Sequence, residues 1–340
     1  MSNHSVTIKD IARILGISKS TVSRALSEQH TDVNAETREK VQALATKLHY
    51  QPNTIALNLK QQRTKTIGVI IPETVNTFFS RAVSGIQKIA NLAGFQVMIC
   101  QSNECYTTEK NNLNSLVATH VDGLLVSLSR ETENTDHFDT LLQKNIPVVF
   151  FDRICENLHT SQVFTDNYKI AFEATQHLID QGCKRIASIA GPRHLYTSCK
   201  RLEGYKDALT KNDIEFNPDY LIYADFKQES IERFTRHLIN LNKCPDAIFA
   251  LNDMTAIEMM HIIKKNGLRI PQDIAVLGFN NDKIGQFVEP SLSTIDMPAQ
   301  DMGEAAAELL LFHIKNPHQK PEKRLIYSKL IVRDSTRLRS

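Results

Sequence analysis

The segment TIKDIARILGISKSTVSRALS, residues 7–27, contains two helical patterns separated by the short turn GIS. Thr7 begins a capping-box pattern, and apolar residues then recur at helical spacing until Gly16, which predicts a first helix over about 8–15. Ser18 can cap a second helix with one apolar side. Two helices joined by so short a turn predict a helix-turn-helix, whose second helix enters the major groove of DNA.

The outer face of the second helix carries hydroxyl and cationic side chains. Residues 1–65 hold ten Lys or Arg against five Asp or Glu, in a chain whose net charge is only +2. A basic head on a mildly acidic body indicates a polyanionic partner. A third helix, capped near Asn34, completes a small core. We predict two kinds of DNA contact from these side chains, namely base readers Lys19, Ser20 and Arg24 and phosphate anchors Ser18, Thr21 and Ser23.

A short apolar segment, TIALNLK, follows the third helix. Pro52 ends that helix and Asn53 can cap a new one, but two turns are marginally stable alone. The segment would therefore need a partner helix, DNA or both, unless it is a plain interdomain linker. We also assign Thr7, Asn34, Tyr50 and Asn53 to the DNA interface.

This N-terminal region resembles the headpiece of the lac repressor family (LacI/GalR). The resemblance is carried by TIKDIARILGISKSTVSRALS and by VNAETREKVQALATKLHYQPNTIALNLK. In that family the second of these segments ends in a hinge helix that folds on the operator, and two such helices insert leucines into the minor groove. The resemblance implies that Leu59 is this wedge and that Lys60 is a minor-groove contact. It also matches Lys19 and Ser20 to the base-reading pair and Arg24 to the guanine-reading arginine.

From Thr66 onward the sequence pattern changes, and short apolar runs alternate with helical patterns. Two such series predict two doubly wound parallel-sheet subdomains, in which ligands sit at the carboxyl ends of the strands. The expected strands are 66–71, 95–100, 121–127, 146–151, 185–191, 219–224, 247–252 and 274–280. Polar or aromatic side chains follow several of them, as a carbohydrate cleft requires. These are Asn76, Phe78, Phe79, Asp152, Arg153, Asp253, Asn280 and Asn281.

The body is also similar to the same family, whose effector domain is like a periplasmic sugar-binding protein. By match, its effector contacts fall on Phe78, Phe79, Asp152, Arg153, Thr197, Arg201, Phe226, Asn252, Asp253 and Asn280. Where the family usually has an aspartate after GF or GY, this chain has Asn280. A basic ligand group is therefore disfavoured, and a sugar acid, a phosphosugar and a neutral sugar all stay open.

The resemblance implies a fold with an all-α helix-turn-helix headpiece and an α/β body that crosses between subdomains three times. We predict a headpiece over 1–51, a hinge helix and linker over 52–65, an N-terminal effector subdomain over 66–163 with 294–320, and a C-terminal one over 164–293 with 321–340. The chain ends without leucine heptads, so we expect a homodimer and no tetramer.

Other function classes find little support. The start MSNHSVTIKD has no apolar signal region and no run could span a membrane, so we expect a cytoplasmic protein. The absence of an apolar signal region and the presence of a basic headpiece argue against the alternative of a solute-binding protein without a regulatory role. Enzyme motifs are absent, and the six cysteines form no C-x-x-C pair. We therefore predict no enzyme, no cofactor and no metal, but a repressor of carbohydrate genes with operator DNA and a small effector as partners.

Overall fold

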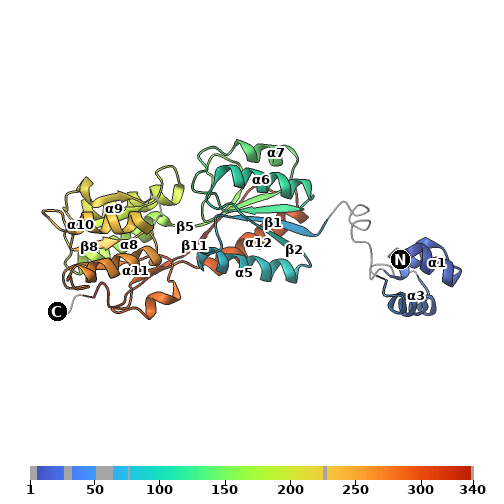
Figure 1. Cartoon of the computed structure of the whole chain (residues 1–340). Helices are drawn as coiled ribbons and strands as arrows, with labels where there is room; N and C mark the ends of the chain where they lie inside the picture. Colours follow the sequence, from blue (N-terminus) through green and yellow to red (C-terminus); the bar gives the residue numbers. More distant parts are fainter. Residues whose placement is uncertain (1–5, 27–32, 51–63, 76, 225–227, 338–340) are drawn as a thin grey trace. The chain divides into compact units, whose positions relative to one another are not determined.

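The computed structural model describes residues 6–26, 33–50, 64–75, 77–224 and 228–337. The chain divides into two compact units, residues 1–64 and residues 65–340 (Figure 1). No helix in these described ranges combines the length and hydropathy that a bilayer crossing requires.

The first unit is built from three helices around a small apolar core. They are α1 (Ile8–Leu15), α2 (Lys19–Ala25) and α3 (Ala35–Lys47). Gly16 ends α1 with φ of 65°, a conformation that glycine adopts without strain. The predicted helix-turn-helix is therefore confirmed. The buried core residues are Ile11, Ala12, Val22, Ala25, Val41 and Ala45.

The second unit has two lobes, each built on a parallel sheet. The first lobe has six strands in the order β11-β5-β4-β3-β1-β2. In chain order they are β1 (Thr66–Ile71), β2 (Gln96–Gln101), β3 (Gly123–Val126), β4 (Val148–Phe151), β5 (Ser161–Thr165) and β11 (Lys323–Ile326). Its helices are α5 (Thr77–Leu92), α6 (Tyr106–Ala118), α7 (Asp139–Gln143), α12 (Ala299–Lys315) and the short 3₁₀ helix η1 (Asp136–Phe138).

The second lobe has four parallel strands in the order β7-β6-β8-β9. They are β6 (Ile186–Ala190), β7 (Leu221–Tyr223), β8 (Ala247–Phe249) and β9 (Ala275–Leu277). Its helices are α8 (Asn167–Asp180), α9 (Tyr196–Lys211), α10 (Gln228–Ile239), α11 (Asp253–Lys265) and the 3₁₀ helices η2 (Pro218–Tyr220) and η3 (Lys283–Gln286). The prediction of two doubly wound sheets is confirmed.

Three segments connect the lobes, and here the structure differs from the expected boundaries. The chain crosses after β5, before α12 and after β11, beside the antiparallel pair β10 (Thr294–Asp296) and β12 (Lys329–Ile331). The predicted boundaries place residues 321–340 in the C-terminal subdomain, but β11 pairs in parallel with β5 in the sheet of the first lobe. Neither β5 nor β11 has the long apolar run of a typical central parallel strand; β11 forms one edge of that sheet, and β5 lies between β11 and β4.

Two glycines let α5 and α12 approach closely against the first sheet. A Cβ atom at Gly303 would lie 2.0 Å from the carbonyl oxygen of Ala82, and one at Gly85 would lie 2.2 Å from that of Gln300. Backbone atoms cannot move away as a flexible side chain can, so these positions exclude a larger residue.

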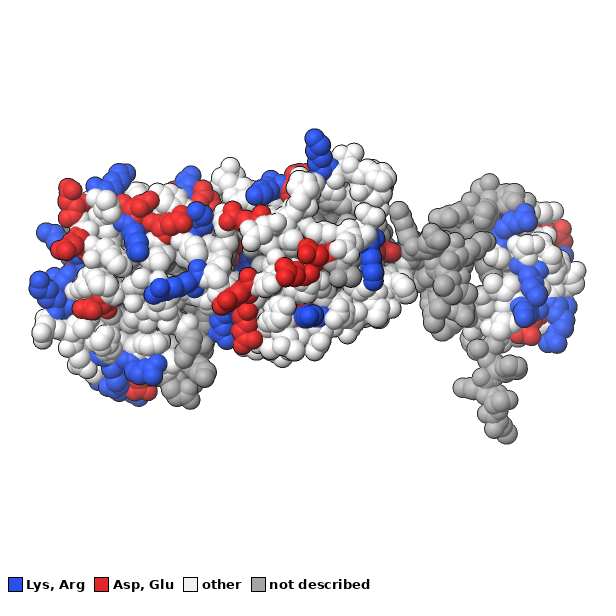
Figure 2. Space-filling view, turned by 90° about the horizontal axis from the view of Figure 1, so that it is seen from above, with Lys and Arg blue, Asp and Glu red and all other residues white. Residues whose placement is uncertain are grey.

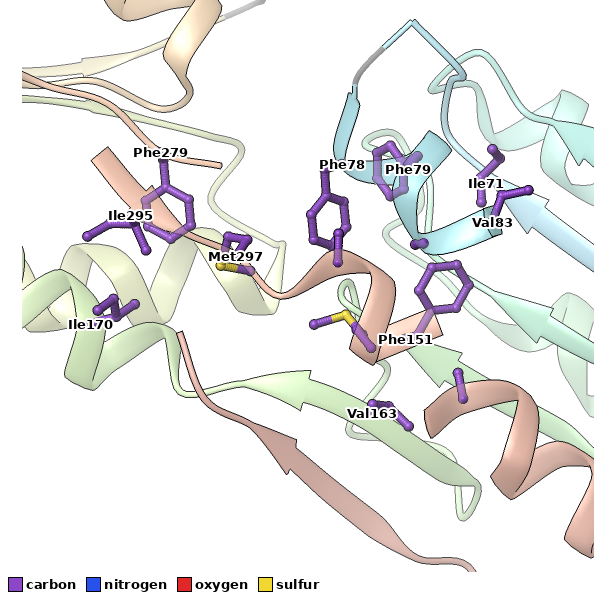
Figure 3. Packing of buried hydrophobic residues seen from close by; sticks show 14 of the residues in the cluster. Ile71, Phe78, Phe79, Val83, Phe151, Val163, Ile170, Phe279, Ile295 and Met297 are labelled. Atoms are coloured by element: carbon purple, nitrogen blue, oxygen red, sulfur yellow. The ribbon is translucent and has the colours of Figure 1, made fainter. Parts of the chain in front are cut away.

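One hydrophobic cluster runs from the first lobe into the second. Phe78, Phe79 and Phe151 belong to its first-lobe part, and Phe279 and Ile295 to its second-lobe part (Figure 3). The cluster therefore places aromatic rings next to the region where the strand ends of the two lobes meet.

Candidate functional site

The start of α2 is held by a local network of hydroxyl groups. Ser18 Oγ accepts a hydrogen bond from the Thr21 backbone N–H at 3.1 Å, and it lies 2.7 Å from Ser20 Oγ and 2.8 Å from Thr21 Oγ1. Val22 and Ala25 on the opposite side are buried in the core. The predicted contact residues are thus brought to one surface, with Ser18, Lys19, Ser20 and Arg24 exposed and Thr21 and Ser23 half-buried.

The other predicted DNA contacts of this unit lie at helix ends. The Thr7 hydroxyl donates to Asp10 Oδ2 at 2.7 Å, and Asn34 caps α3 by accepting from the Glu36 backbone N–H at 3.0 Å. Tyr50 is half-buried against the core. Figure 2 shows Lys and Arg side chains gathered on the visible face of this unit, as a polyanion-binding surface requires. Predictions for Asn53, Leu59, Lys60, Asn76 and Phe226 lie outside the described residues.

A cavity in the body lies where the carboxyl ends of strands from both lobes meet, and we call it the cleft. It has a volume of about 70 Å³. Eight of the predicted effector contacts line it, namely Phe78, Phe79, Asp152, Arg153, Thr197, Arg201, Asn252 and Asn280. Five further lining residues were not predicted from the sequence, namely Gly191, Pro192, Leu195, Ser198 and Leu251.

Special backbone conformations present several of these side chains. Asp152 follows β4 with φ of 58°, and Asn280 follows β9 with φ of 112°. Asn252 caps α11 by accepting from the Thr255 backbone N–H at 2.8 Å. The aromatic wall is formed by Phe78 and Phe79 in the first turn of α5, whose rings meet edge to face.

Arg153 is held by a two-point ion pair behind the cleft wall. Its Nη1 lies 2.6 Å from Glu104 Oε2 and its Nη2 lies 2.8 Å from Glu104 Oε1. Burial raises the pKa of the Glu104 carboxyl, but the hydrogen bonds and charge of Arg153 outweigh it and hold the pKa below its usual value. Burial lowers the pKa of Arg153, but Glu104 more than compensates for it. Both groups therefore stay charged.

Arg201 occupies a different environment on α9. Its guanidinium lies over the ring of Phe279 at 3.6 Å from the centroid, and its Nε donates to Asn167 Oδ1 at 2.8 Å. Burial lowers the pKa of Arg201 to about 10, partly offset by the charge of Asp152. Burial also raises the pKa of the Asp152 carboxyl, opposed by the charges of Arg153 and Arg201. The cleft thus contains the cation Arg201 and the anion Asp152, and the attraction between them only partly offsets the cost of burying their charges.

Asp253 does not line the cleft, although the sequence suggested it as an effector contact. Its Oδ1 accepts from the Thr294 hydroxyl and its Oδ2 from the Asp282 backbone N–H, each at 2.6 Å. The residue is fully buried, and burial raises the pKa of its carboxyl to about 6. Asp253 therefore ties the start of α11 to β10 and to the loop before η3. A pattern of polar residues at strand ends cannot by itself distinguish this structural role from ligand contact.

Hydrogen bonds bridge the lobes beside the cleft. The Thr77 hydroxyl donates to Asp282 Oδ1, and His194 Nε2 lies 2.6 Å from the Arg130 carbonyl oxygen. Each joins one residue of the first lobe to one of the second. Both contacts must break or move if the lobes separate.

The arrangement suits a polyhydroxylated ligand. Carboxylate, amide and guanidinium groups can exchange hydrogen bonds with neighbouring hydroxyls, and an aromatic ring can cover the apolar face of a sugar. The present volume is far below the roughly 300 Å³ of a typical small-molecule site. A ligand of sugar size therefore requires the lobes to open or the lining side chains to move.

Comparison with known proteins gives the same two regions. Residues 7–53 match the family described as bacterial regulatory proteins, lacI family, and residues 175–336 match a periplasmic binding protein-like domain. The HTH-type transcriptional repressor CytR of Escherichia coli is 34% identical over 334 residues, which cover 97% of this chain and 96% of CytR.

Two solved structures extend this similarity to three dimensions. The lac repressor dimer bound to operator and the anti-inducer ONPF has a TM-score of 0.86 at 27% identity, covering 98% of this chain and 99% of that one. The transcriptional regulator CelR in complex with cellobiose has a TM-score of 0.73 at 28% identity, covering 97% and 99%. The chain therefore belongs to the lacI family of bacterial regulatory proteins and is a transcriptional repressor of that family.

Proposed function

We propose that this repressor binds a pseudo-palindromic operator as a homodimer and that a sugar or sugar derivative in the cleft controls this binding. The observation that carries the proposal is the convergence of eight predicted contact residues on one cavity between two lobes. Action on DNA also implies a cytoplasmic location.

The first unit supplies the operator contacts. Two copies of α2, one from each protomer, would lie in successive major grooves, about 34–36 Å apart along the duplex. In each copy, Arg24 would donate to a guanine edge while Lys19 and Ser20 probe its neighbours. Leu59 would act as the minor-groove wedge and Lys60 would contact the groove beside it.

The cleft supplies the effector contacts. Asp152 would accept hydrogen bonds from ligand hydroxyls, Arg201 would donate to ligand oxygens, and the amides of Asn252 and Asn280 can do both. Phe79 would cover the apolar face of the ring. The complex of CelR with cellobiose supports a carbohydrate as the ligand class.

Coupling between the two sites would run through lobe movement. Because the cleft is smaller than a sugar, a ligand that opens the lobes would change the contacts of Thr77 with Asp282 and of His194 with Arg130. Such a change alters the lobe surfaces on which a second protomer can pack, and so the pairing of the two DNA-binding units. The sign of this coupling free energy decides whether the effector releases or promotes operator binding.

The proposal is tested with the purified full chain in two steps. A thermal-shift screen of sugars, sugar acids and phosphosugars identifies the ligand, since a ligand at 100 times its Kd adds about 2.7 kcal/mol of stability. Binding to a duplex selected by the protein from random DNA is then measured with and without that ligand. Saturating ligand must change the operator affinity, and an unchanged affinity contradicts the proposal. A solute-binding protein without a regulatory role would bind the ligand but select no DNA.

A further inference from the structure

We propose that Glu104 sets the charge selectivity of the cleft: by neutralising Arg153 it reserves the site for an uncharged polyhydroxylated ligand. This inference rests on the proposed carbohydrate effector and narrows its class. Glu104 does not itself line the cleft, so it acts through Arg153 as a specificity-determining residue.

The charge count of the lining leads to this conclusion. Three charged residues are among those that line the cleft, namely Asp152, Arg153 and Arg201. Taken alone they carry a net positive charge, which would favour an anionic ligand. The carboxylate of Glu104 directly behind Arg153 removes this excess. Glu73 and Arg130, which also act on the pKa of this pair, carry opposite charges and leave the balance unchanged.

The position of the Glu104 carboxylate is fixed by more than its ion pair. Its Oε2 also accepts from the Arg130 backbone N–H at 2.7 Å, and its backbone oxygen accepts from the Glu131 N–H at 3.3 Å. The side chains of Glu104 and Arg153 are only 12% and 13% exposed, so water screens the pair weakly. Glu104 therefore cannot swing away to make room for a ligand anion.

The hydrogen bonds of Arg153 also favour an uncharged ligand. Nη1 donates to Glu104 and to the Leu128 carbonyl oxygen at 3.2 Å, and Nη2 donates to Glu104. Three of the five N–H donors that a guanidinium carries are thus engaged within the protein. A carboxylate or phosphate on the ligand could reach only the remaining donors of Arg153, on Nε and Nη2, and it would be repelled by the Glu104 carboxylate. A neutral hydroxyl needs only a single donor.

The Glu104→Gln variant tests the inference, with Glu304→Gln as the matched control. Glu304 lies on α12 in the same lobe, also makes a two-point ion pair, with Lys88 at 2.9 and 3.0 Å, and does not line the cleft. Calorimetry on the full-length proteins would compare D-glucose with D-gluconate and D-glucose 6-phosphate, and D-ribose with D-ribose 5-phosphate. The measured quantity is the ratio of the Kd of the anionic ligand to that of its neutral counterpart.

Wild type and E304Q should favour the neutral ligands, and E104Q should lower the ratio by about tenfold or more, because the charge of the Arg153 guanidinium is then no longer neutralised. Glutamine keeps the shape of the side chain, and the double variant E104Q/R153Q should restore the neutral preference. Should E104Q not fold, R153Q gives the opposite test: the uncompensated Glu104 should weaken the anionic ligands relative to the neutral ones. A ratio that is the same in E104Q and E304Q, or a wild-type preference for the anionic ligands, overturns the inference.

Inorganic phosphate separates this inference from the proposed sugar effector. Phosphate should raise the melting temperature of E104Q by more than it raises that of E304Q, because the charge of Arg153 is no longer neutralised. In E104Q/R153Q this extra increase should disappear. If no sugar binds but this difference appears, the carbohydrate proposal fails while the role of Glu104 stands. If sugars bind but phosphate acts equally on all variants and the Kd ratios do not move, the role of Glu104 fails.

Discussion

Replacing Arg201 with methionine should leave the stability of the unliganded protein nearly unchanged while abolishing effector binding. The reason is that a charged guanidinium is kept in a buried position where the folded protein gains little from it. Arg201 would then serve to bind the ligand, although its burial lowers the free energy of unfolding of the unliganded protein.

The magnitude follows from the environment of this side chain. Burial lowers the pKa of Arg201 to about 10 from its usual 12.5. At about 1.4 kcal/mol for each pKa unit, removing the charge should release about 3 kcal/mol. Against this, the variant loses the contact with Phe279, worth about 1–2 kcal/mol. It also leaves the Asn167 amide oxygen without that donor, at about 1–3 kcal/mol. The net change should lie within about 2 kcal/mol of zero.

Urea unfolding of the full chain at neutral pH, followed by circular dichroism, measures this change. Arg185→Met is the matched control, because Arg185 lies in the same lobe but is 48% exposed and paired with Asp246 at the surface. The control should lose at most about 1 kcal/mol and keep effector binding. If R201M loses much more than about 3 kcal/mol, or binds the effector as wild type does, the reasoning is refuted.

Three further predictions concern stability and DNA recognition. Burial raises the pKa of Asp253 to about 6, so the folded state holds this proton more tightly than the unfolded one. Its contribution to stability is full below about pH 4 and is lost as the pH rises through about 6. Wild type should therefore lose roughly 1–2 kcal/mol between about pH 5 and pH 8 by urea unfolding, and equal losses in D253N would contradict this assignment. G303A should lower the free energy of unfolding by about 1–3 kcal/mol, because its Cβ would meet the Ala82 backbone. Helix propensity alone predicts a gain of about 1 kcal/mol, so a raised urea midpoint would disprove the close packing. R24A should lose about 1–3 kcal/mol of discrimination between operator and random DNA while keeping weak, salt-sensitive binding, and unchanged specificity in a competition assay would exclude base reading by Arg24.

Local signals explain why most elements could be predicted from the sequence. The first helix was expected over about 8–15 and spans Ile8–Leu15, because Thr7 and Gly16 mark its ends chemically. The central strands were recognised because both their faces are buried, which gives continuous apolar runs. The edge strand β11 lacks this signal, since its residues alternate between exposed and half-buried positions.

Several of the residues that line the cleft could be predicted from their positions at strand ends. The ion pairs and hydrogen bonds among the surrounding residues could not. The strand-end rule, together with the family resemblance, found Asp152 and Arg153. The same rule at β2 points to Glu104, three residues after the strand. The ion pair itself joins residues 49 positions apart and follows only from the fold. The same limit applies to Asp253, whose buried hydrogen bonds come from segments distant in sequence.

Operator affinity in the presence and absence of the cleft ligand tests the central claim most directly. Fluorescence anisotropy would be measured on a duplex selected by the wild-type protein, with a saturating ligand from the thermal-shift screen, for wild type and R201M. The account predicts a change of about 5- to 150-fold in wild type and none in R201M. An operator affinity that does not respond to the ligand in wild type, or that responds equally in R201M, would contradict it.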